Sequence, residues 1–109
     1  MVYDKFLSHV KDERDLQKVV FEFLRKAGAW FYHPRETRKG SDGIPDIVGC
    51  LNGKFFAIEL KSPSYKDPAK HLRSEQRKVL ELIKKAGGFV LVANRFEDVV
   101  EFINLIRRI

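Results

Sequence analysis

The dipeptide Asn52-Gly53 constrains this chain more than any other feature, because it separates two apolar runs at 46–51 and 54–61. Asn-Gly strongly favours a two-residue hairpin turn, since both turn positions adopt positive φ. The two runs are therefore predicted to pair as antiparallel strands that begin with Leu51 opposite Lys54. Carried outward, this register places Asp46 opposite Glu59.

The predicted register brings three charged side chains to one face of the hairpin. Directly opposed residues share a face with Cβ atoms about 4.5–5.5 Å apart, so Asp46 and Glu59 are neighbours. The alternation of a strand adds Lys61 to the same face. The opposite face is expected to be the more deeply buried one, because its residues are apolar: Ile47, Leu51, Phe56, Ile58 and Leu60.

Two opposed carboxylates need compensation, because like charges opposite one another destabilise a sheet. A divalent cation such as Mg²⁺ or Mn²⁺ would supply it, since these ions prefer oxygen ligands. The alternative is a solvated face on which Lys61 merely pairs with Glu59. Gly40, Gly43 and Pro45 precede the first strand and suit a tight backbone entering it, although an ordinary loop would also contain them.

The remaining pattern predicts helices and strands in the order αβββαβα, which indicates a mixed sheet with packed helices and the α/β class. A helix from about 12 to 27 follows from apolar residues at three- and four-residue spacing. The other expected elements are a strand at 29–33, a loop at 35–45, the hairpin, a loop at 62–73, a helix at 74–86, a strand at 89–93 and a helix at 96–109. The helix at 74–86 has an apolar stripe of Val79, Leu80, Ile83 and Ala86. The last helix is expected to face inward through Val99, Val100, Phe102, Ile103 and Ile106.

Length and composition predict one globular domain over residues 1–109, with 44% hydrophobic and 33% charged residues. No apolar run approaches the ~20 residues of a membrane span, and the charged start lacks a signal-peptide core, so a cytoplasmic protein is expected. The net charge of +6 suggests a polyanionic partner. Cys50, the single cysteine, excludes an internal disulfide and is predicted to be a small core residue.

The segment Gly43-Ile44-Pro45-Asp46, followed after the hairpin by Glu59-Leu60-Lys61, resembles the PD-(D/E)XK nuclease superfamily. Within it the chain is most similar to the VRR-NUC group, especially small stand-alone members from phages and bacteria. The resemblance extends over residues 13–93 and implies a restriction-endonuclease-like fold. The Val-Arg-Arg tripeptide of the group's name is absent, and the nearest string is Ile106-Arg107-Arg108.

The resemblance implies a role for each matching residue. Asp46 and Glu59 would bind one or two Mg²⁺ or Mn²⁺ ions together with the Leu60 backbone carbonyl, and Lys61 would be the catalytic lysine. Glu13 matches the acidic position of the family's first helix and would reach the metal through water or help bind a second ion. Gln76 matches a family glutamine that orients the lysine, the water or a phosphate oxygen.

The residues alone leave alternatives open for Glu13 and Gln76. Glu13 and Gln17 share one side of the first helix at the end of an apolar stripe. Gln76 likewise precedes the apolar stripe of its own helix. Polar residues in such places are commonly rim residues or helix caps.

Basic loop residues on both sides of the motif would hold DNA phosphates in a salt-dependent, sequence-tolerant way. These residues are Arg35, Arg38, Lys39, Lys66, Lys70, His71, Arg73, Arg77 and Lys78. No recognition helix for reading bases is evident, and a solvated surface is the alternative. His33 and His71 are expected to be structural or phosphate-contacting, because no second histidine stands at metal-ligand spacing.

The sequence thus predicts a Mg²⁺- or Mn²⁺-dependent endodeoxyribonuclease without a membrane or small-molecule cofactor. The family implies a homodimer acting on branched or four-way-junction DNA, since a two-fold dimer places two sites on two strands. Three alternatives remain open: a nucleic-acid-binding module that lost activity, an RNA-processing nuclease, and a partner protein whose carboxylates bind a basic surface.

Overall fold

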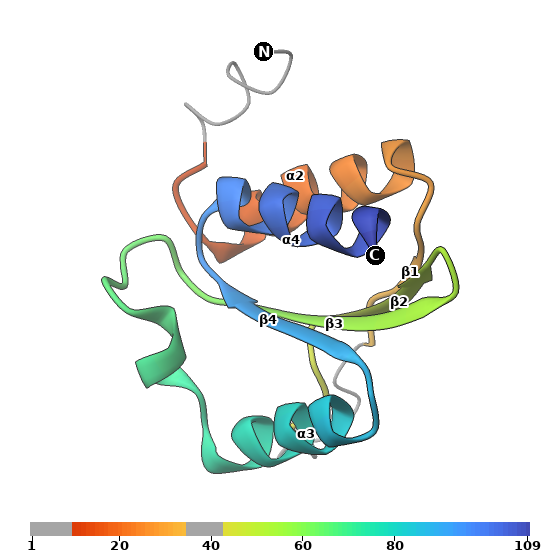
Figure 1. Cartoon of the computed structure of the whole chain (residues 1–109). Helices are drawn as coiled ribbons and strands as arrows, with labels where there is room; N and C mark the ends of the chain where they lie inside the picture. Colours follow the sequence, from red (N-terminus) through yellow and green to blue (C-terminus); the bar gives the residue numbers. More distant parts are fainter. Residues whose placement is uncertain (1–9, 35–42) are drawn as a thin grey trace.

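The computed structural model describes residues 10–34 and 43–109 and arranges them in three layers, with a sheet between helices (Figure 1). Helices α2 and α4 cover one face of the sheet and α3 lies beneath the other. In chain order the elements are α2 (Glu13–Lys26), β1 (Trp30–Tyr32), β2 (Ile47–Leu51), β3 (Lys54–Leu60), the 3₁₀-helix η1 (Pro68–His71), α3 (Ser74–Lys85), β4 (Phe89–Ala93) and α4 (Phe96–Arg108). The α/β class and the order αβββαβα are confirmed.

The strands follow one another across the sheet in the order β1-β2-β3-β4. The first three are antiparallel, whereas β4 runs parallel to β3 because α3 carries the chain back across the sheet. The hairpin has the predicted register, from Leu51 opposite Lys54 to Ile47 opposite Ile58. Its turn has φ 52° at Asn52 and 76° at Gly53, as the dipeptide predicts.

The main core lies between the sheet and the pair of helices α2 and α4. The hairpin face predicted to be apolar is buried there, including Phe56 and Ile58. It packs against buried side chains from both helices, namely Leu16, Val20, Leu24, Val99, Ile103 and Ile106. Phe102, expected to face inward, is half-buried and meets Phe56 edge-on with ring centroids 6.4 Å apart.

Asp12 sets the start of α2 and hence the position of its first turn. Its Oδ1 accepts a hydrogen bond from the Asp15 N–H at 2.9 Å, as an N-cap residue does. Basic residues Arg25 and Lys26 lie in the last turn, where they complement the helix dipole. None of the helices within 10–34 and 43–109 is long and apolar enough to cross a membrane.

Three predictions about local structure differ from the fold. Cys50 is exposed rather than buried, because it projects from the outer face of β2 between Trp30 and Phe55, which are 67% and 46% exposed. Ala86 is exposed because it caps α3 beyond the last turn instead of extending the stripe. The segment 62–73, expected to be a loop, contains η1, which Pro68 begins with a φ already suited to a helix.

Candidate active site

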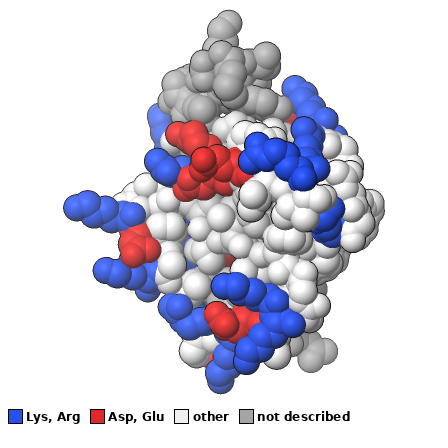
Figure 2. Space-filling model, in the orientation of Figure 1, with Lys and Arg blue, Asp and Glu red and all other residues white. Residues whose placement is uncertain are grey.

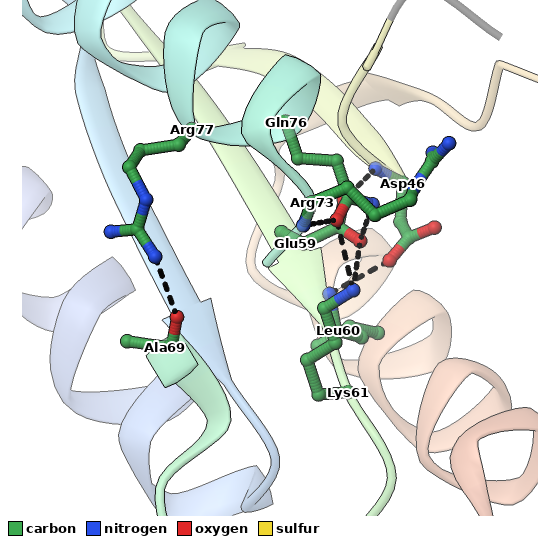
Figure 3. A network of polar contacts seen from close by, with 8 residues as sticks. All are labelled: Asp46, Glu59, Leu60, Lys61, Ala69, Arg73, Gln76 and Arg77. Carbon is green, nitrogen blue, oxygen red and sulfur yellow. Dashed lines mark hydrogen bonds and ion pairs between the residues drawn. The ribbon is translucent and has the colours of Figure 1, made fainter. Parts of the chain in front are cut away.

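Asp46 and Glu59 lie together where strands β2 and β3 reach the open end of their hairpin. Asp46 immediately precedes β2 and Glu59 is the last residue but one of β3. The Asp46 N–H donates to Glu59 Oε1 at 3.2 Å, and the Leu60 N–H donates to Asp46 Oδ2 at 2.7 Å (Figure 3). Each carboxylate therefore accepts a hydrogen bond from the backbone of the other strand, and the predicted juxtaposition is confirmed.

The main chain at Asp46 is also held from β1. His33, one residue beyond β1, donates through Nδ1 to the Asp46 carbonyl oxygen at 2.6 Å, which requires the tautomer or ion that carries a proton there. The Phe21 ring of α2 lies against His33, with centroids 5.2 Å apart. The second oxygen of the Asp46 carboxylate, Oδ1, points away from the hydrogen-bonded group in Figure 3. That oxygen is the one that a bound cation could use.

Glu59 is almost fully buried, at 3% exposed, and α3 supplies most of what surrounds it. Gln76 Nε2 donates to Glu59 Oε2 at 2.8 Å, and Lys61 Nζ lies 3.4 Å from the same oxygen. Both Glu59 oxygens are therefore engaged by side chains and backbone of this chain. A buried carboxylate held in this way has its orientation set before any substrate arrives.

Gln76 joins the first turn of α3 to Glu59 and Lys61. Its Oε1 accepts from the Arg73 N–H at 2.9 Å, which is the backward cap that a glutamine at the third helical position makes. The same oxygen accepts from Lys61 Nζ at 3.1 Å. The cap that the sequence offers for Gln76 is present, and the same side chain also contacts Lys61 and Glu59.

Gly43 allows α3 to approach this closely. Its φ is +78°, and a Cβ at this position would lie 2.4 Å from the backbone carbon and oxygen of Glu75. The loop leading to Asp46 thus packs directly on the first turn of α3, next to Gln76. The tight backbone predicted at Gly43 is confirmed, whereas Gly40 lies outside the described residues.

Three acids at the site share one electrostatic consequence. Burial raises the pKa of Glu59 to about 7, the charge of Asp46 adds to that rise, and Lys61 opposes it. Burial also raises the pKa of Asp46. The pKa of Glu13 is raised by burial and, to a smaller extent, by the negative charge of Asp46. Neighbouring carboxyl groups whose pKa values are raised in this way need a positively charged ligand to ionise together.

Glu13 is the first residue of α2 and lies near Asp46, but it does not form a closed metal site with Asp46 and Glu59. Its electrostatic partners are Asp46 and Lys61. Within the described ranges, no three or more His, Cys, Asp or Glu side chains are grouped closely enough to enclose a metal. Two carboxylates in reach of a backbone carbonyl fit a hard ion that completes its shell with water and substrate oxygens, as Mg²⁺ does, and not a closed zinc site.

The Leu60 carbonyl is the backbone oxygen suited to such an ion. The Leu60 N–H points toward Asp46. In a strand, the C=O of a residue points to the same side as its N–H. One pair beyond Ile47 and Ile58, the register sets Leu60 opposite Pro45. Pro45 has no N–H, so it cannot occupy that carbonyl as a ladder donor would.

The predicted DNA-binding residues that the structure describes lie on the side of the site that η1 and α3 form. All six are exposed: Lys66, Lys70, His71, Arg73, Arg77 and Lys78. Arg35, Arg38 and Lys39 lie outside the described residues. Figure 2 shows basic side chains gathered over α3, at the bottom of the view, with acidic ones among them.

The segment that carries Lys66, Lys70 and His71 is held by hydrogen bonds from Asn94, a residue that the sequence does not single out. Asn94, directly after β4, donates through Nδ2 to the Ser62 and Tyr65 carbonyls at 3.1 and 2.5 Å. His71 stacks on Tyr65 with ring centroids 3.6 Å apart and 6° between the rings, a contact that fits the structural one of its two expected roles. A polar residue directly after a parallel strand was the available signal for Asn94.

The fold and site together define a PD-(D/E)XK nuclease: a mixed sheet whose hairpin presents Asp46, Glu59 and Lys61 next to helix α3. Residues 10–108 match the family model of the archaeal Holliday junction resolvase (Hjc), and the chain belongs to this nuclease family. A solved structure entitled "VRR_NUC domain" is also similar, with a TM-score of 0.66 and 25% sequence identity over 84% of this chain and 94% of the other. The superfamily resemblance seen in the sequence is confirmed.

Proposed function

We propose that this protein is a Mg²⁺- or Mn²⁺-dependent endonuclease that hydrolyses phosphodiester bonds in branched or four-way-junction DNA. The observation that carries the proposal is the Asp46, Glu59, Lys61 and Gln76 group, in which two strands and one helix converge on a pair of carboxylates. Membership of a junction-resolvase family supports both the reaction and the substrate class.

The acidic residues and one carbonyl would hold the cation. Asp46 offers Oδ1, Glu59 lies beside it, the Leu60 carbonyl points to the same side, and Glu13 would contribute through water. When bound, the cation would acidify the attacking water and neutralise charge on the scissile phosphate. The raised pKa of Glu59 means that the protein gives up a proton there when the cation binds near pH 7.

Lys61 would act on the scissile phosphate from a position that the protein sets in advance. Its Nζ is held between Gln76 Oε1 and Glu59 Oε2, at 3.1 and 3.4 Å. A cation placed where negative charge develops stabilises the transition state without reorganising during the reaction. Gln76 is then a positioning residue, because it fixes Lys61 and Glu59 relative to each other.

A homodimer would bring two such sites to the two strands of a junction. The surface best suited to self-association is the aromatic end of the sheet, which we define as Trp30, Tyr32, Cys50 and Phe55. Trp30, Cys50 and Phe55 are in register across three strands, and Tyr32 is 56% exposed. A contiguous uncharged aromatic surface on a basic protein fits another protein surface better than a polyanion.

The direct test is cleavage of labelled four-way-junction, duplex and RNA substrates with Mg²⁺, Mn²⁺ or EDTA. Cleavage of junction DNA with either ion, none with EDTA, and a loss of at least about 100-fold in Glu59→Gln and Lys61→Ala are expected. Lys85→Ala, on the last turn of α3, is the control and should cleave normally. Binding without any cleavage would indicate an inactive module, and preferential cleavage of RNA would indicate the processing nuclease.

A further inference from the structure

A further surface feature adjoins the site on the side opposite α3. It is a cleft of about 530 Å³ that reaches Asp46. Its remaining described walls come from the first half of α2 and from the chain after β1, namely Arg14, Gln17, Lys18, Phe21, His33 and Pro34. The cleft and the candidate metal site therefore share Asp46.

The cleft has a cationic rim on α2. Arg14 and Lys18 are four residues apart, so they lie one turn from each other on the same side of the helix. Both are exposed, and neither forms an ion pair with a residue in the described part of the chain. Asp46 is the only acid among the described lining residues. Two cations at this spacing, with no ion-pair partner among the described residues, are suited to a phosphate group.

The floor of the cleft is aromatic. The Phe21 ring contacts both His33 and Phe31, with centroids 5.2 and 5.5 Å apart. His33 is held by its Nδ1 bond to the Asp46 carbonyl, so Nε2 is the ring nitrogen that a ligand can reach. Pro34 adds a rigid apolar edge. Aromatic rings beside two neighbouring cations match a nucleotide, which combines a flat base and a sugar with an anionic phosphate.

We propose that this cleft binds the nucleotide adjacent to the scissile phosphate, with its phosphate between Arg14 and Lys18 and its sugar or base against Phe21 and His33. The inference rests on the proposed function, since it places one arm of the substrate beside Asp46. The basic residues of η1 and α3 lie on the other side of Asp46 and Glu59. The DNA strand would then be gripped on both sides of the bond that is cut.

The test is DNA binding in EDTA, where the measurement does not depend on cleavage. Fluorescence anisotropy with a labelled four-way junction should show a Kd at least about 10-fold higher for Arg14→Ala/Lys18→Ala than for the parent chain. The slope of log Kd against log salt should fall by about 2, one for each phosphate that the variant no longer neutralises. Arg25→Ala/Lys26→Ala is the matched control, because it removes the same charge from the far end of the same helix and should change Kd less than about 3-fold.

Two further variants separate local from general effects. Arg14→Lys/Lys18→Arg keeps the charges and should recover binding to within about 3-fold. Phe21→Leu keeps the core filled but removes the ring, and should raise Kd while leaving the salt slope unchanged. Equal binding by the Arg14→Ala/Lys18→Ala and Arg25→Ala/Lys26→Ala variants would overturn the cleft assignment.

The failure of this inference differs from the failure of the proposed function. Metal-dependent cleavage with KM unchanged in Arg14→Ala/Lys18→Ala would reject the cleft and retain the nuclease. A parent chain that never cleaves, yet loses binding and salt slope in that variant, would support the cleft and reject the nuclease. When both hold, KM should rise at least about 10-fold with kcat nearly unchanged, because neither side chain is placed at the reacting atoms.

Discussion

The two faces of the β2–β3 hairpin have the same backbone and opposite tasks. One face buries Ile47, Phe56 and Ile58 completely against α2 and α4. The other face carries Glu59 and Lys61 at the open end, where both are hydrogen-bonded to Gln76 of α3. At the turn end, the same face carries the exposed side chains of Cys50 and Phe55. The comparison shows that alternation along a strand decides which side chains share a face, whereas the helix packed over that face decides what the face does.

The largest effect should come from breaking the apolar face. Phe56→Ala removes a side chain that is 0% exposed, and should lower the free energy of unfolding by about 3–5 kcal/mol. That is a large part of the stability of a chain this size. Urea denaturation followed by circular dichroism measures it. Glu59→Gln, on the other face, should keep the fold, and an equal loss of stability in both variants would contradict the division of tasks.

Two glycines sharpen the comparison between the open end and the turn end of the hairpin. Gly43 and Gly53 have φ of +78° and +76°, but only Gly43 is crowded, by Glu75 and Gln76, whereas nothing lies within 4 Å of a Cβ at Gly53. Gly53→Ala should cost about 1–2 kcal/mol through the backbone alone. Gly43→Ala should cost more and also reduce cleavage at least about 10-fold, because it separates the loop before Asp46 from α3. Similar cleavage rates in the two variants would show that this close approach does not matter.

The pH dependence of stability tests the electrostatic character of the site face. Because burial and Asp46 raise the pKa of Glu59 from 4.5 to about 7, the folded protein holds a proton that the unfolded chain has lost. This contribution is fully present below about pH 4.5 and is lost as pH rises to about 7, so metal-free stability should fall across that window. Denaturation midpoints at a series of pH values measure the slope. Glu59→Gln should flatten this slope, and a slope that is as steep in that variant as in the parent chain would point to another group.

The smallest effect on monomer stability should come from the aromatic end of the sheet. Trp30→Lys/Phe55→Lys changes exposed side chains and should alter the free energy of unfolding by only about 0.5 kcal/mol. It should nevertheless weaken self-association strongly, as measured by sedimentation velocity across protein concentrations. Leu82→Lys is the control, because Leu82 is 66% exposed on α3. A parent chain that stays monomeric at every concentration would reject the dimer surface.

Sequence reasoning succeeded where the determinants are local. Asn52 and Gly53 set the turn, the turn sets the register, and the register brings Asp46 to Glu59 without reference to the rest of the fold. The apolar face followed from the same alternation. The helix boundaries are predicted to within a residue or two, because Asp12 before α2 and the glycines after α2 and α3 are local signals.

The features that were missed depend on packing between distant segments. The apolar neighbours of Cys50 predict a core position, but its side chain lies exposed beside Trp30 and Phe55 on the sheet. The bond from His33 to Asp46 needs β1 to pair with β2, and the bonds from Asn94 need β4 to end beside Ser62. The cleft of Arg14 and Lys18 likewise exists only because α2 lies against the end of β1.

Calorimetric titration of the protein with Mn²⁺ near pH 7 tests the central claim most directly, because it measures cation binding without DNA or turnover. The account predicts binding accompanied by proton release, seen as a heat that varies with the buffer's ionisation enthalpy. Asp46→Asn and Glu59→Gln should each abolish that binding, whereas Glu81→Gln, on the exposed face of α3, should leave it unchanged. Absence of binding by the parent chain, or binding that survives both substitutions at the paired acids, would contradict the account.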